Sequence, residues 1–575
     1  MEFKIEVNNR QISVREGDSL LTALRGHGFK IPTLCHMNRF SPTGACRLCV
    51  VEVEGKRDLI TSCSYPVEEG MKVMTNSQRV IRARKSLVEL LLSNHPDDCL
   101  YCQRNGNCEL QWLAEEMNVR ERKYFGEKNT AFPDYSSTAV AREPAKCVLC
   151  SRCVRICEEV QLVTAVDFIS RGNQTKVNSA FHKGLNVSSC IHCGQCVQVC
   201  PTAALLDISH IEKVQAALGK AELEVVFFIS PSVAASVAEH SGLRPKQDVM
   251  GRMVAALKRC GASRVFDLGY ANDINILAEA RLLAERIRNK EALPLLSSCC
   301  PAWVRYAEEF RQELLPRLAG VKSPQQILGS LIKTKWAEDA GLKADHVFTV
   351  SVMPCLAKKY EASREENTHK GVSEVDAVLT VREFFRLLRS FGLEIESIEE
   401  EAADPPFHIC SASAFKLGYS GGKAEAVARE TFRLLGGSPA EGFRFNLPKN
   451  TALKRETKVS IGDIHIGFAW ASSISEAEAY LNTLAEENRS DIHYVEVMAC
   501  LEGCAGGGGQ PVSRGFEKTR ARRRLCADME KNQPFRAAGE HPGPLACFTD
   551  HRLDTGNERA NGWLKPSFKK RKGPL

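Results

Sequence analysis

The spacing of the cysteines constrains this 575-residue chain more than any other feature. Nineteen of the 24 cysteines fall into groups, and one spacing, with two, two and three residues between successive cysteines, occurs twice. The chain begins with strand-like alternation and lacks the apolar region of an export signal, so metal ligation explains these thiols better than disulfide bonding. The repeated groups are Cys147, Cys150, Cys153 and Cys157, then Cys190, Cys193, Cys196 and Cys200.

The doubled spacing, followed by Pro201, is the pattern of bacterial two-cluster ferredoxins. In that fold the fourth cysteine of each run ligates the other cluster. One 4Fe–4S cluster should therefore take Cys200 with the first three cysteines of the first run. The other should take Cys157 with the first three of the second run. We expect a ferredoxin-like domain with two 4Fe–4S clusters over residues 138–210.

Residues 1–80 form another module, in which strand-like alternation leads into four further cysteines. These are Cys35, Cys46, Cys49 and Cys63. One close pair with a single cysteine before it and another after it resembles plant-type ferredoxins, although the first gap is longer here. Those proteins bind a 2Fe–2S cluster in a β-grasp fold. Zinc is the alternative, but zinc sites usually show two close pairs.

Residues 81–125 carry a smaller group of ligands. Helical periodicity over about residues 78–93 predicts an amphipathic helix with Leu87, Leu90 and Leu91 on one face. The helix leads into one histidine and three cysteines with ligand spacing: His95, Cys99, Cys102 and Cys108. The spacing alone leaves both zinc and a 4Fe–4S cluster open.

From about residue 211 predicted strands alternate with helices. The strands are expected at 224–229, 264–268, 293–296, 346–352, 376–380, 464–470 and 493–497. This order predicts parallel βαβ units, so the fold class is multidomain, with α+β modules followed by a large α/β domain of mostly parallel sheets over residues 211–575. In such sheets ligands bind beyond the carboxyl ends of the strands. The cysteines just after predicted strands are Cys299, Cys300, Cys355, Cys500 and Cys504.

Three motifs contain these cysteines: Ser-Ser-Cys-Cys-Pro-Ala-Trp from Ser297, Met-Pro-Cys-Leu-Ala-Lys-Lys-Tyr-Glu from Met353, and Met-Ala-Cys-Leu-Glu-Gly-Cys from Met498. They closely resemble the signatures of iron–iron (FeFe) hydrogenases, and the resemblance extends over nearly the whole chain. It implies an H-cluster, a 4Fe–4S cube joined to a diiron group that carries CO, cyanide and azadithiolate. The implied cube ligands are Cys300, Cys355, Cys500 and Cys504, with the last bridging to the diiron group.

The same resemblance assigns a 4Fe–4S cluster to the His95 module, because that module recurs in these hydrogenases and in the large iron–sulfur subunit of respiratory complex I. The expected cofactors are therefore an H-cluster, one 2Fe–2S cluster and three further 4Fe–4S clusters. Together the N-terminal clusters would form an electron relay to the H-cluster.

The resemblance also places side chains around the diiron group. Lys358 matches a lysine that donates to a cyanide ligand, as suits a cation beside an anionic ligand. The other matching positions are Pro231, Ser232, Gln325, Met353 and Met498. Gly507 and Gly508, inside a run of four glycines, would let backbone approach the cluster closely. Taken singly, an exposed lysine, an N-cap serine or a core methionine would explain such residues equally well.

A proton path is implied as well. Cys299 matches the proton-donating thiol of the family, Glu279 the first carboxylate of the relay, and Arg286 lies two helical turns later. The relay of well-studied members continues through a serine and a second glutamate, where this chain has Ala319 and Leu282. Residues 518–575 also diverge and replace a more helical tail.

Composition excludes some classes of function. A formal charge of +7 with no basic stripe gives no support for nucleic-acid binding, and the basic run at residues 569–572 is interpreted as a solvated tail. No apolar run is long enough to span a bilayer, so a cytoplasmic location is the default. Nicotinamide would be handled by partner subunits that bind NAD(P)H and flavin, since no dinucleotide-binding glycine motif is evident.

Within the family the chain looks most like the catalytic subunit of multimeric NAD(P)-linked enzymes. Ferredoxin as the direct partner of a lone monomer is the nearest alternative. Maturation proteins would have to build the diiron group. A hydrogen sensor, an assembly factor of the hydrogenase-like kind and a complex I-like electron-transfer subunit stay open as non-catalytic hypotheses. The last leaves the three C-terminal motifs without a purpose.

Overall fold

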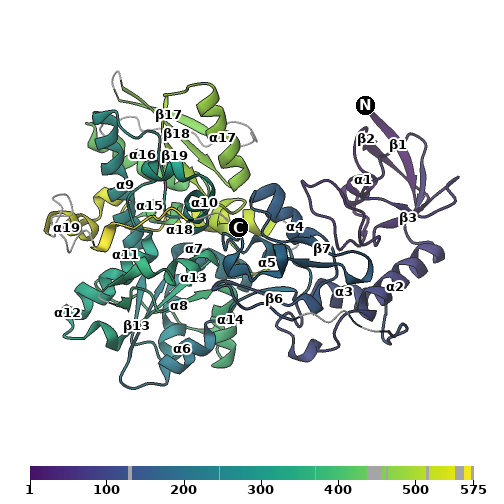
Figure 1. Ribbon diagram of the computed structural model, residues 1–575, viewed down its shortest axis with the longest axis horizontal. Coiled ribbons are helices and arrows are strands. Elements are labelled where there is room, and N and C mark those ends of the chain that lie inside the picture. The colour runs from purple at the N-terminus through teal and green to yellow at the C-terminus, as the bar shows by residue number, and fades with distance from the viewer. Residues whose placement is uncertain are drawn as a thin grey trace.

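The computed structural model describes residues 1–126, 128, 132–244, 247–369, 371–436, 445, 455–461, 464–512, 517–550 and 562–571. Figure 1 shows small N-terminal modules on one side and a large C-terminal domain on the other, with the ferredoxin-like segment around α4 and α5 between them. No helix in the described part of the chain has the length and apolar character needed to cross a bilayer.

The first module is a mixed five-stranded sheet with strand order β2-β1-β5-β3-β4. Its elements are β1 (Glu2–Val7), β2 (Arg10–Arg15), α1 (Leu20–Gly26), β3 (Val50–Val53), β4 (Ile60–Thr61) and β5 (Lys72–Met74). β1 pairs antiparallel with β2 and parallel with β5. Its core contains Cys49 and Cys63 beside apolar residues of the strands, so the ligand thiols are part of the packing.

The helix predicted after this sheet is present as α2 (Gln78–Ser93), and of the three leucines predicted to share a face, Leu87 and Leu91 pack against the core but Leu90 does not. Val80, Arg84 and Val88 are buried, whereas Leu90 is 51% exposed. Val88 packs with Leu34, Leu48 and Leu113, which come from the cysteine loop and from α3 (Glu109–Glu116). These neighbours determine which face of α2 is buried, and they lie outside the helix in the sequence.

The ferredoxin-like segment has little regular structure. Its strands form two pairs, β6 (Val140–Arg142) with β9 (Leu205–Asp207) and β7 (Asp167–Ile169) with β8 (Lys176–Asn178). The short helices α4 (Arg152–Arg155) and α5 (Gln195–Val199) follow the two cysteine loops. Cys153 and Cys200 lie in its small hydrophobic core.

Two four-stranded sheets form the C-terminal domain. The first has the order β11-β10-β13-β16 and is wholly parallel. The second has the order β12-β19-β18-β17, with only β17 antiparallel. The strands are β10 (Glu224–Ile229), β11 (Arg264–Asp267), β12 (Leu295–Leu296), β13 (Val347–Met353), β16 (Ala377–Thr380), β17 (Glu456–Ile461), β18 (Ile464–Ala471) and β19 (Ile492–Val497). The predicted strands are confirmed except that 293–296 is shorter, since Pro294 cannot donate to a ladder.

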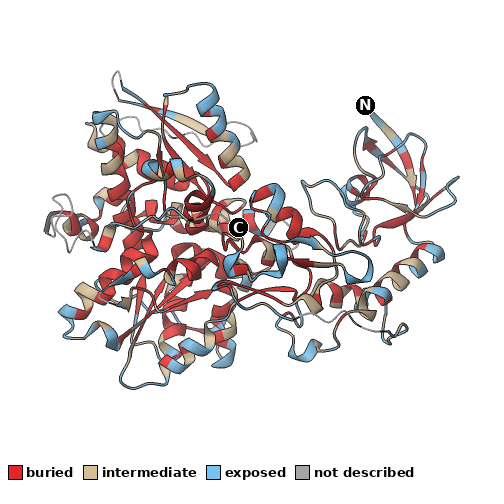
Figure 2. Ribbon diagram, in the orientation of Figure 1, coloured by how far each residue is buried: buried red, intermediate tan, exposed pale blue. Residues whose placement is uncertain are grey.

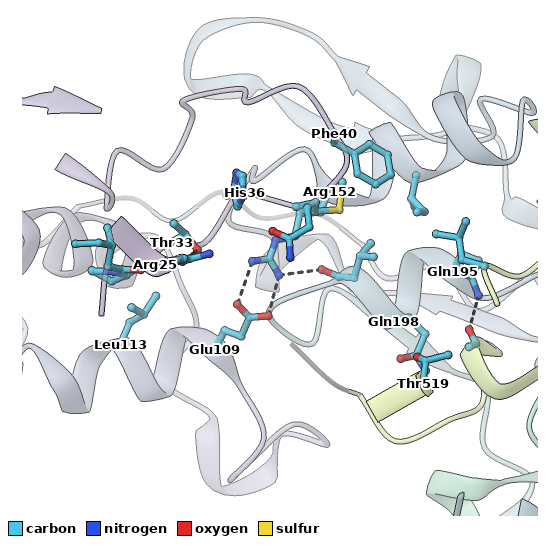
Figure 3. Close-up of a pocket in the computed structure, with 18 of the residues that line it drawn as sticks. Arg25, Thr33, His36, Phe40, Glu109, Leu113, Arg152, Gln195, Gln198 and Thr519 are labelled. Carbon is cyan, nitrogen blue, oxygen red and sulfur yellow. Dashed lines mark hydrogen bonds and ion pairs between the residues drawn. The ribbon is translucent and has the colours of Figure 1, made fainter. Parts of the chain in front are cut away.

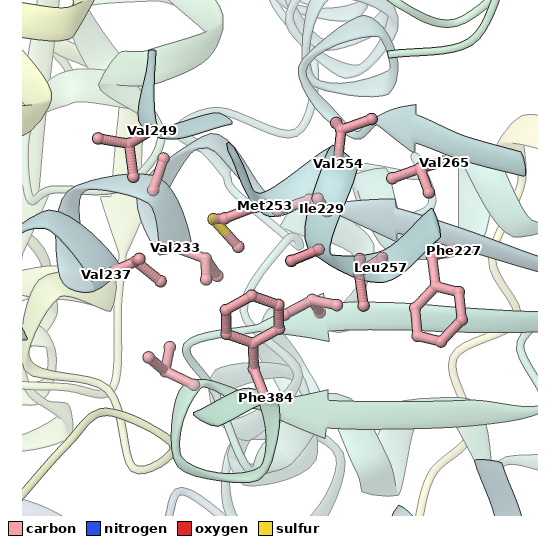
Figure 4. Close-up of a cluster of buried hydrophobic side chains, with 14 of the residues drawn as sticks. Phe227, Ile229, Val233, Val237, Val249, Met253, Val254, Leu257, Val265 and Phe384 are labelled. Atoms are coloured by element: carbon pink, nitrogen blue, oxygen red, sulfur yellow. The ribbon is translucent and has the colours of Figure 1, made fainter. Parts of the chain in front are cut away.

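Helices cover both faces of the first sheet, as expected for strands that are apolar throughout. Phe227 of β10 packs against α7 (Pro231–Ser241), α8 (Val249–Arg259) and α14 (Val381–Ser390) (Figure 4). Phe228 points to the opposite face, toward α9 (Gly269–Asn289) and α11 (Pro324–Leu331). Buried residues therefore extend through the whole interior of this domain, whereas many residues of the N-terminal modules are exposed (Figure 2).

The tail is more helical than predicted. It contains α18 (Glu517–Glu530) and α19 (Pro542–Asp550), and Arg522 of α18 is buried against Glu239 with Nη2 3.0 Å from Oε2. The described part of the basic run is not a free tail either, because Arg571 Nε donates to Glu308 Oε2 at 2.9 Å. Ion pairs with residues distant in sequence thus hold both segments against the domain, although the basic run was predicted to be a solvated tail.

Candidate active site

The cysteines of the three motifs converge on one cavity of about 80 Å³. Cys299 and Cys300 follow β12, Cys355 follows β13, and Cys500 and Cys504 follow β19. The cavity therefore lies where the carboxyl ends of the two parallel sheets meet, which is the expected location for a ligand.

Burial dominates the electrostatics of these thiols. It raises the pKa of Cys355 to about 12 and the pKa values of Cys500 and Cys504 well above the ordinary range. A thiolate in such a site needs a compensating positive charge, and metal ions bound to thiolates supply it. The donor set thus fits a metal cluster.

Most of the other predicted site residues line the same cavity: Ser232, Gln325, Met353, Lys358, Met498 and Gly507. Lys358 Nζ donates to Glu361 Oε2 at 2.8 Å and to the Cys299 carbonyl at 3.3 Å, which fixes its ammonium at the cavity wall. Gln325 donates to the same Glu361 carboxylate and accepts from Ser351. Ser230, Asn272, Ala414 and Gly418 also line the cavity, although the sequence did not single them out.

Three of the residues predicted to bind the cofactor lie elsewhere. Pro231 is buried at the start of α7, and its neighbours Ser230 and Ser232 line the cavity instead. The guanidinium of Arg286 donates to the carbonyl oxygens of Ala292 and Arg317, so it ties the end of α9 to loops. A Cβ on Gly508 would lie 2.5 Å from the Cys193 carbonyl, so its close approach is to the ferredoxin-like segment.

The ferredoxin-like ligands are also brought together. Cys147, Cys150, Cys153 and Cys200 line one small cavity, which is the crossed set that the doubled spacing predicts. In the second run the pKa of the Cys196 thiol is raised well above normal, first by burial and then by Cys193, Cys190, Cys157 and Cys153. The first group of thiols thus lies together as the exchange of the fourth cysteine predicts, whereas for the second group the exchange stays a prediction.

In the first two modules only some of the predicted ligands are in contact with one another. The Cys46 backbone N–H donates to Cys35 Sγ at 3.5 Å, and Cys49 hydrogen bonds with Cys63. His95 Nδ1 is buried without a hydrogen-bond partner, as fits a ligand atom whose partner is a metal. Among the described residues, no three His, Cys, Asp or Glu side chains gather closely enough to hold a single metal ion.

The second ferredoxin-like group lies directly against the cysteine cavity. Gln195 Nε2 donates to the Gly506 carbonyl at 2.9 Å, and Leu356, next to Cys355, packs in the ferredoxin-like core. The His192 ring stacks on Tyr360 with ring centroids 4.5 Å apart. The second ferredoxin-like group is therefore in direct contact with the loops that carry Cys355 and the glycine run.

Another cavity, of about 490 Å³, is larger than the cysteine-lined one. It lies among α1, α3, the first cysteine loop and α5 (Figure 3). Arg152 crosses it to Glu109, with Nη1 2.8 Å from Oε1 and Nη2 3.1 Å from Oε2. It separates the first module from the ferredoxin-like segment and holds none of the predicted ligands.

Comparison with protein families assigns the four parts. Residues 1–78 match a 2Fe–2S iron-sulfur cluster binding domain, and residues 84–123 match the NADH-ubiquinone oxidoreductase-G iron-sulfur binding region. Residues 146–204 match a 4Fe–4S dicluster domain. Residues 223–508 match the C-terminal domain of the iron-only hydrogenase large subunit. The alternative of zinc in the first two modules is thereby replaced by iron–sulfur binding.

Full-length relatives decide the family. The NADP-reducing hydrogenase subunit HndD of Solidesulfovibrio fructosivorans is 35% identical over 99% of both chains. The chain belongs to the FeFe-hydrogenase family. Iron hydrogenase 1 of Clostridium pasteurianum is 33% identical over 98% of this hydrogenase and 100% of its own length. A variant of the apo FeFe-hydrogenase HydA1 from Chlamydomonas reinhardtii matches with a TM-score of 0.55 and 25% identity, over 64% of this chain and all of that one.

Sequence reasoning missed some buried polar groups of this hydrogenase. Lys423, Tyr494 and Glu496 are fully buried beside Glu279 and the start of α16 (Gly422–Leu434). Only the polar character of Lys423, in a helix start that is otherwise small and apolar, could have drawn attention to it.

Proposed function

We propose that the chain catalyses reversible hydrogen oxidation and proton reduction at an H-cluster bound in the cysteine cavity. The observation that carries the proposal is the convergence of five cysteines and Lys358 from two sheets on one buried cavity. Cys300, Cys355, Cys500 and Cys504 would hold the cube, and Lys358 would donate to an anionic ligand of the diiron group. When bound, the group supplies the open iron site at which hydrogen is split or formed.

The residues around the cavity would protect and supply that site. Met353 and Met498 give it apolar walls, and the buried Gln325 is held by Ser351 and Glu361. Burial raises the pKa of the Cys299 thiol to about 11, so this thiol carries a proton at neutral pH. It would hand that proton to the reacting site, and the buried Glu279 would supply the next one.

The N-terminal clusters would carry electrons between the cavity and a partner. The Cys193 group adjoins the cavity, and Cys108 Sγ lies 3.7 Å from the Pro201 carbonyl beside the other ferredoxin-like group. Cys99 is exposed, so a cluster held there would be within reach of a partner protein. We propose NAD(P)- and flavin-binding subunits as that partner, with ferredoxin as the alternative.

The experiment for the activity uses full-length protein matured anaerobically with a synthetic diiron group. We expect infrared bands of CO and cyanide together with viologen-linked hydrogen oxidation and evolution. Cys504→Ala should lose both signals. Cys260→Ala is the matched control, because it removes another cysteine of the same domain that has no ligand pattern. Wild-type protein without the bands, with its other clusters intact by electron paramagnetic resonance, would sink the proposal.

The partner is tested on the same preparation. The chain alone should reduce viologen with hydrogen but leave NAD(P)⁺ unreduced until flavin-containing subunits are added. Rapid reduction of a ferredoxin by the chain alone, with no gain on adding subunits, would favour ferredoxin instead.

A hydrogen sensor is the second candidate, and Ala319 and Leu282 favour it because they interrupt the expected outer proton path. Infrared bands with almost no turnover would be the result that supports it. Leu282→Glu combined with Ala319→Ser should then raise turnover if the interrupted path is the cause.

A further inference from the structure

A fully buried ion pair lies behind the cysteine cavity. Lys423 Nζ of α16 is 2.6 Å from Glu279 Oε1 of α9, and neither side chain has any exposed surface. Their surroundings are apolar and include Ala280, Leu283 and Ala319. Replacing a buried ion pair with apolar residues is often neutral or stabilising, so folding alone gives little reason for this pair.

Both ends of the pair continue into further proton-carrying groups. The Tyr494 hydroxyl of β19 donates to the other carboxylate oxygen, Glu279 Oε2, at 2.8 Å. On the other side the Lys423 ammonium lies close enough to the Cys299 thiol at the cavity wall for each group to shift the pKa of the other. Tyr494, Glu279 and Lys423 therefore form a continuous row that ends at the cavity.

Lys423 is held in place by the turn that starts its helix. The buried Glu496 carboxylate accepts hydrogen bonds from the backbone N–H groups of Gly421 at 2.9 Å and Ala424 at 2.7 Å. A carboxylate at a helix N-terminus is favoured by the free N–H groups and the helix dipole. Since both of its oxygens are used in this way, Glu496 positions Lys423 and is not itself part of the row.

We propose that Tyr494, Glu279 and Lys423 form the proton relay of this hydrogenase, in place of the hydroxyl and carboxylate that Ala319 and Leu282 remove. The inference rests on the proposed function. The Lys423 ammonium passes one proton to the Cys299 side of the cavity. The Glu279 carboxylate then takes the hydroxyl proton of Tyr494 and passes it to the neutral Lys423 amine, while Tyr494 takes up one of the protons that solvent supplies to the reaction. Every group therefore ends as it began and one proton has moved inward.

The test compares two tyrosines that make the same hydrogen bond. Tyr494→Phe removes only the relay hydroxyl. Tyr480→Phe is the matched control, because the Tyr480 hydroxyl also donates to a glutamate, Glu456 Oε2, at 2.8 Å, but neither residue lines the cavity. In loaded protein we expect Tyr494→Phe to lower hydrogen turnover and H₂/D₂O exchange at least tenfold with unchanged CO and cyanide bands. Tyr480→Phe should stay within twofold of wild type.

Lys423→Met should lower both rates further, with a larger solvent isotope effect. A Tyr494→Phe protein that exchanges H₂ with D₂O at the wild-type rate overturns the relay while leaving the hydrogenase proposal intact. A loaded wild type that carries the bands but shows no exchange overturns the relay as well, and it supports the sensor in place of the hydrogenase.

A second readout needs no diiron group. The infrared band of the Glu279 carboxylate, identified by its loss in Glu279→Gln, should shift in Tyr494→Phe and stay in place in Tyr480→Phe. Absence of that shift overturns the relay even if loading fails, whereas missing CO and cyanide bands in the wild type count against the hydrogenase proposal.

Discussion

The ferredoxin-like segment and the C-terminal domain bury their interiors in different ways. In the segment around α4 and α5, Cys153 and Cys200 belong to the small core, and the strands are only three residues long. In the C-terminal domain, strands such as β10 are covered on both faces by helices. Bound iron–sulfur clusters would thus complete the first interior, whereas apolar packing completes the second.

Removal of iron should have the largest effect, and it should affect the two regions differently. We expect residues 138–210 to lose nearly all amide protection in iron-free full-length protein, because eight thiols would be left without the centres that join them. Amides of β10 and β13 should keep theirs. Hydrogen exchange read by mass spectrometry measures both regions in one sample. Equal protection of the ferredoxin-like segment with and without iron would show that its core is sufficient by itself.

A large-to-small change in the C-terminal core should have the converse effect. Phe227→Ala removes a fully buried ring and should lower the free energy of unfolding of that domain by about 3–5 kcal/mol. The visible absorbance of the N-terminal clusters should persist in denaturant that unfolds the domain. Phe168→Ala, at a ring that is 38% exposed in β7, is the control and should cost less than about 1 kcal/mol.

The two regions should also respond oppositely to acid. Burial raises the pKa of Asp267, at the end of β11, from 3.8 to about 7. The folded domain therefore binds a proton that the unfolded chain releases between about pH 4 and 7, and this carboxyl lowers stability as pH rises. Asp267→Asn should be near neutral at pH 4 and stabilising by roughly 2–4 kcal/mol at pH 8. Thiolate–iron bonds weaken at low pH instead.

Denaturant unfolding at several pH values measures the effect. If the difference in free energy of unfolding between Asp267→Asn and wild type does not grow with pH, the Asp267 carboxyl is not the source of the pH dependence.

The smallest effect should be alike in the C-terminal domain and in the N-terminal module that contains α2, since helix caps are local. The Ser473 hydroxyl accepts from the Glu476 N–H at 3.0 Å and caps α17 (Ile474–Glu486), while Ser77 caps α2 through the Val80 N–H at 3.3 Å. Each change to alanine should cost about 1 kcal/mol. Hydrogen exchange of the amides at the starts of α17 and α2 would measure this cost. A loss of amide protection in only one of the two helices would contradict the expectation that the two caps are equivalent.

Local patterns predicted much of this molecule. Strand bounds in the C-terminal domain followed from apolar runs, and the crossed set ending in Cys200 followed from spacing. What failed depended on neighbours distant in sequence. Leu90 was wrongly included in the apolar face of α2 because Leu34 and Leu113 determine which residues of the helix are covered, and Arg286 and Gly508 were placed at the cofactor because nothing local showed their contacts. Tyr494 and Glu279 are 215 residues apart, so only the fold joins them.

The cysteine cavity has a mechanical consequence. Cys300, Cys500 and Cys504 follow strands of one sheet, whereas Cys355 follows a strand of the other. Any group held by all four is thus a direct crosslink between the ends of strands in two different sheets. Its bonds, and not side-chain contacts alone, would resist a change in the angle between the sheets. Loading the cavity should therefore stiffen the whole domain, including regions far from the bound group.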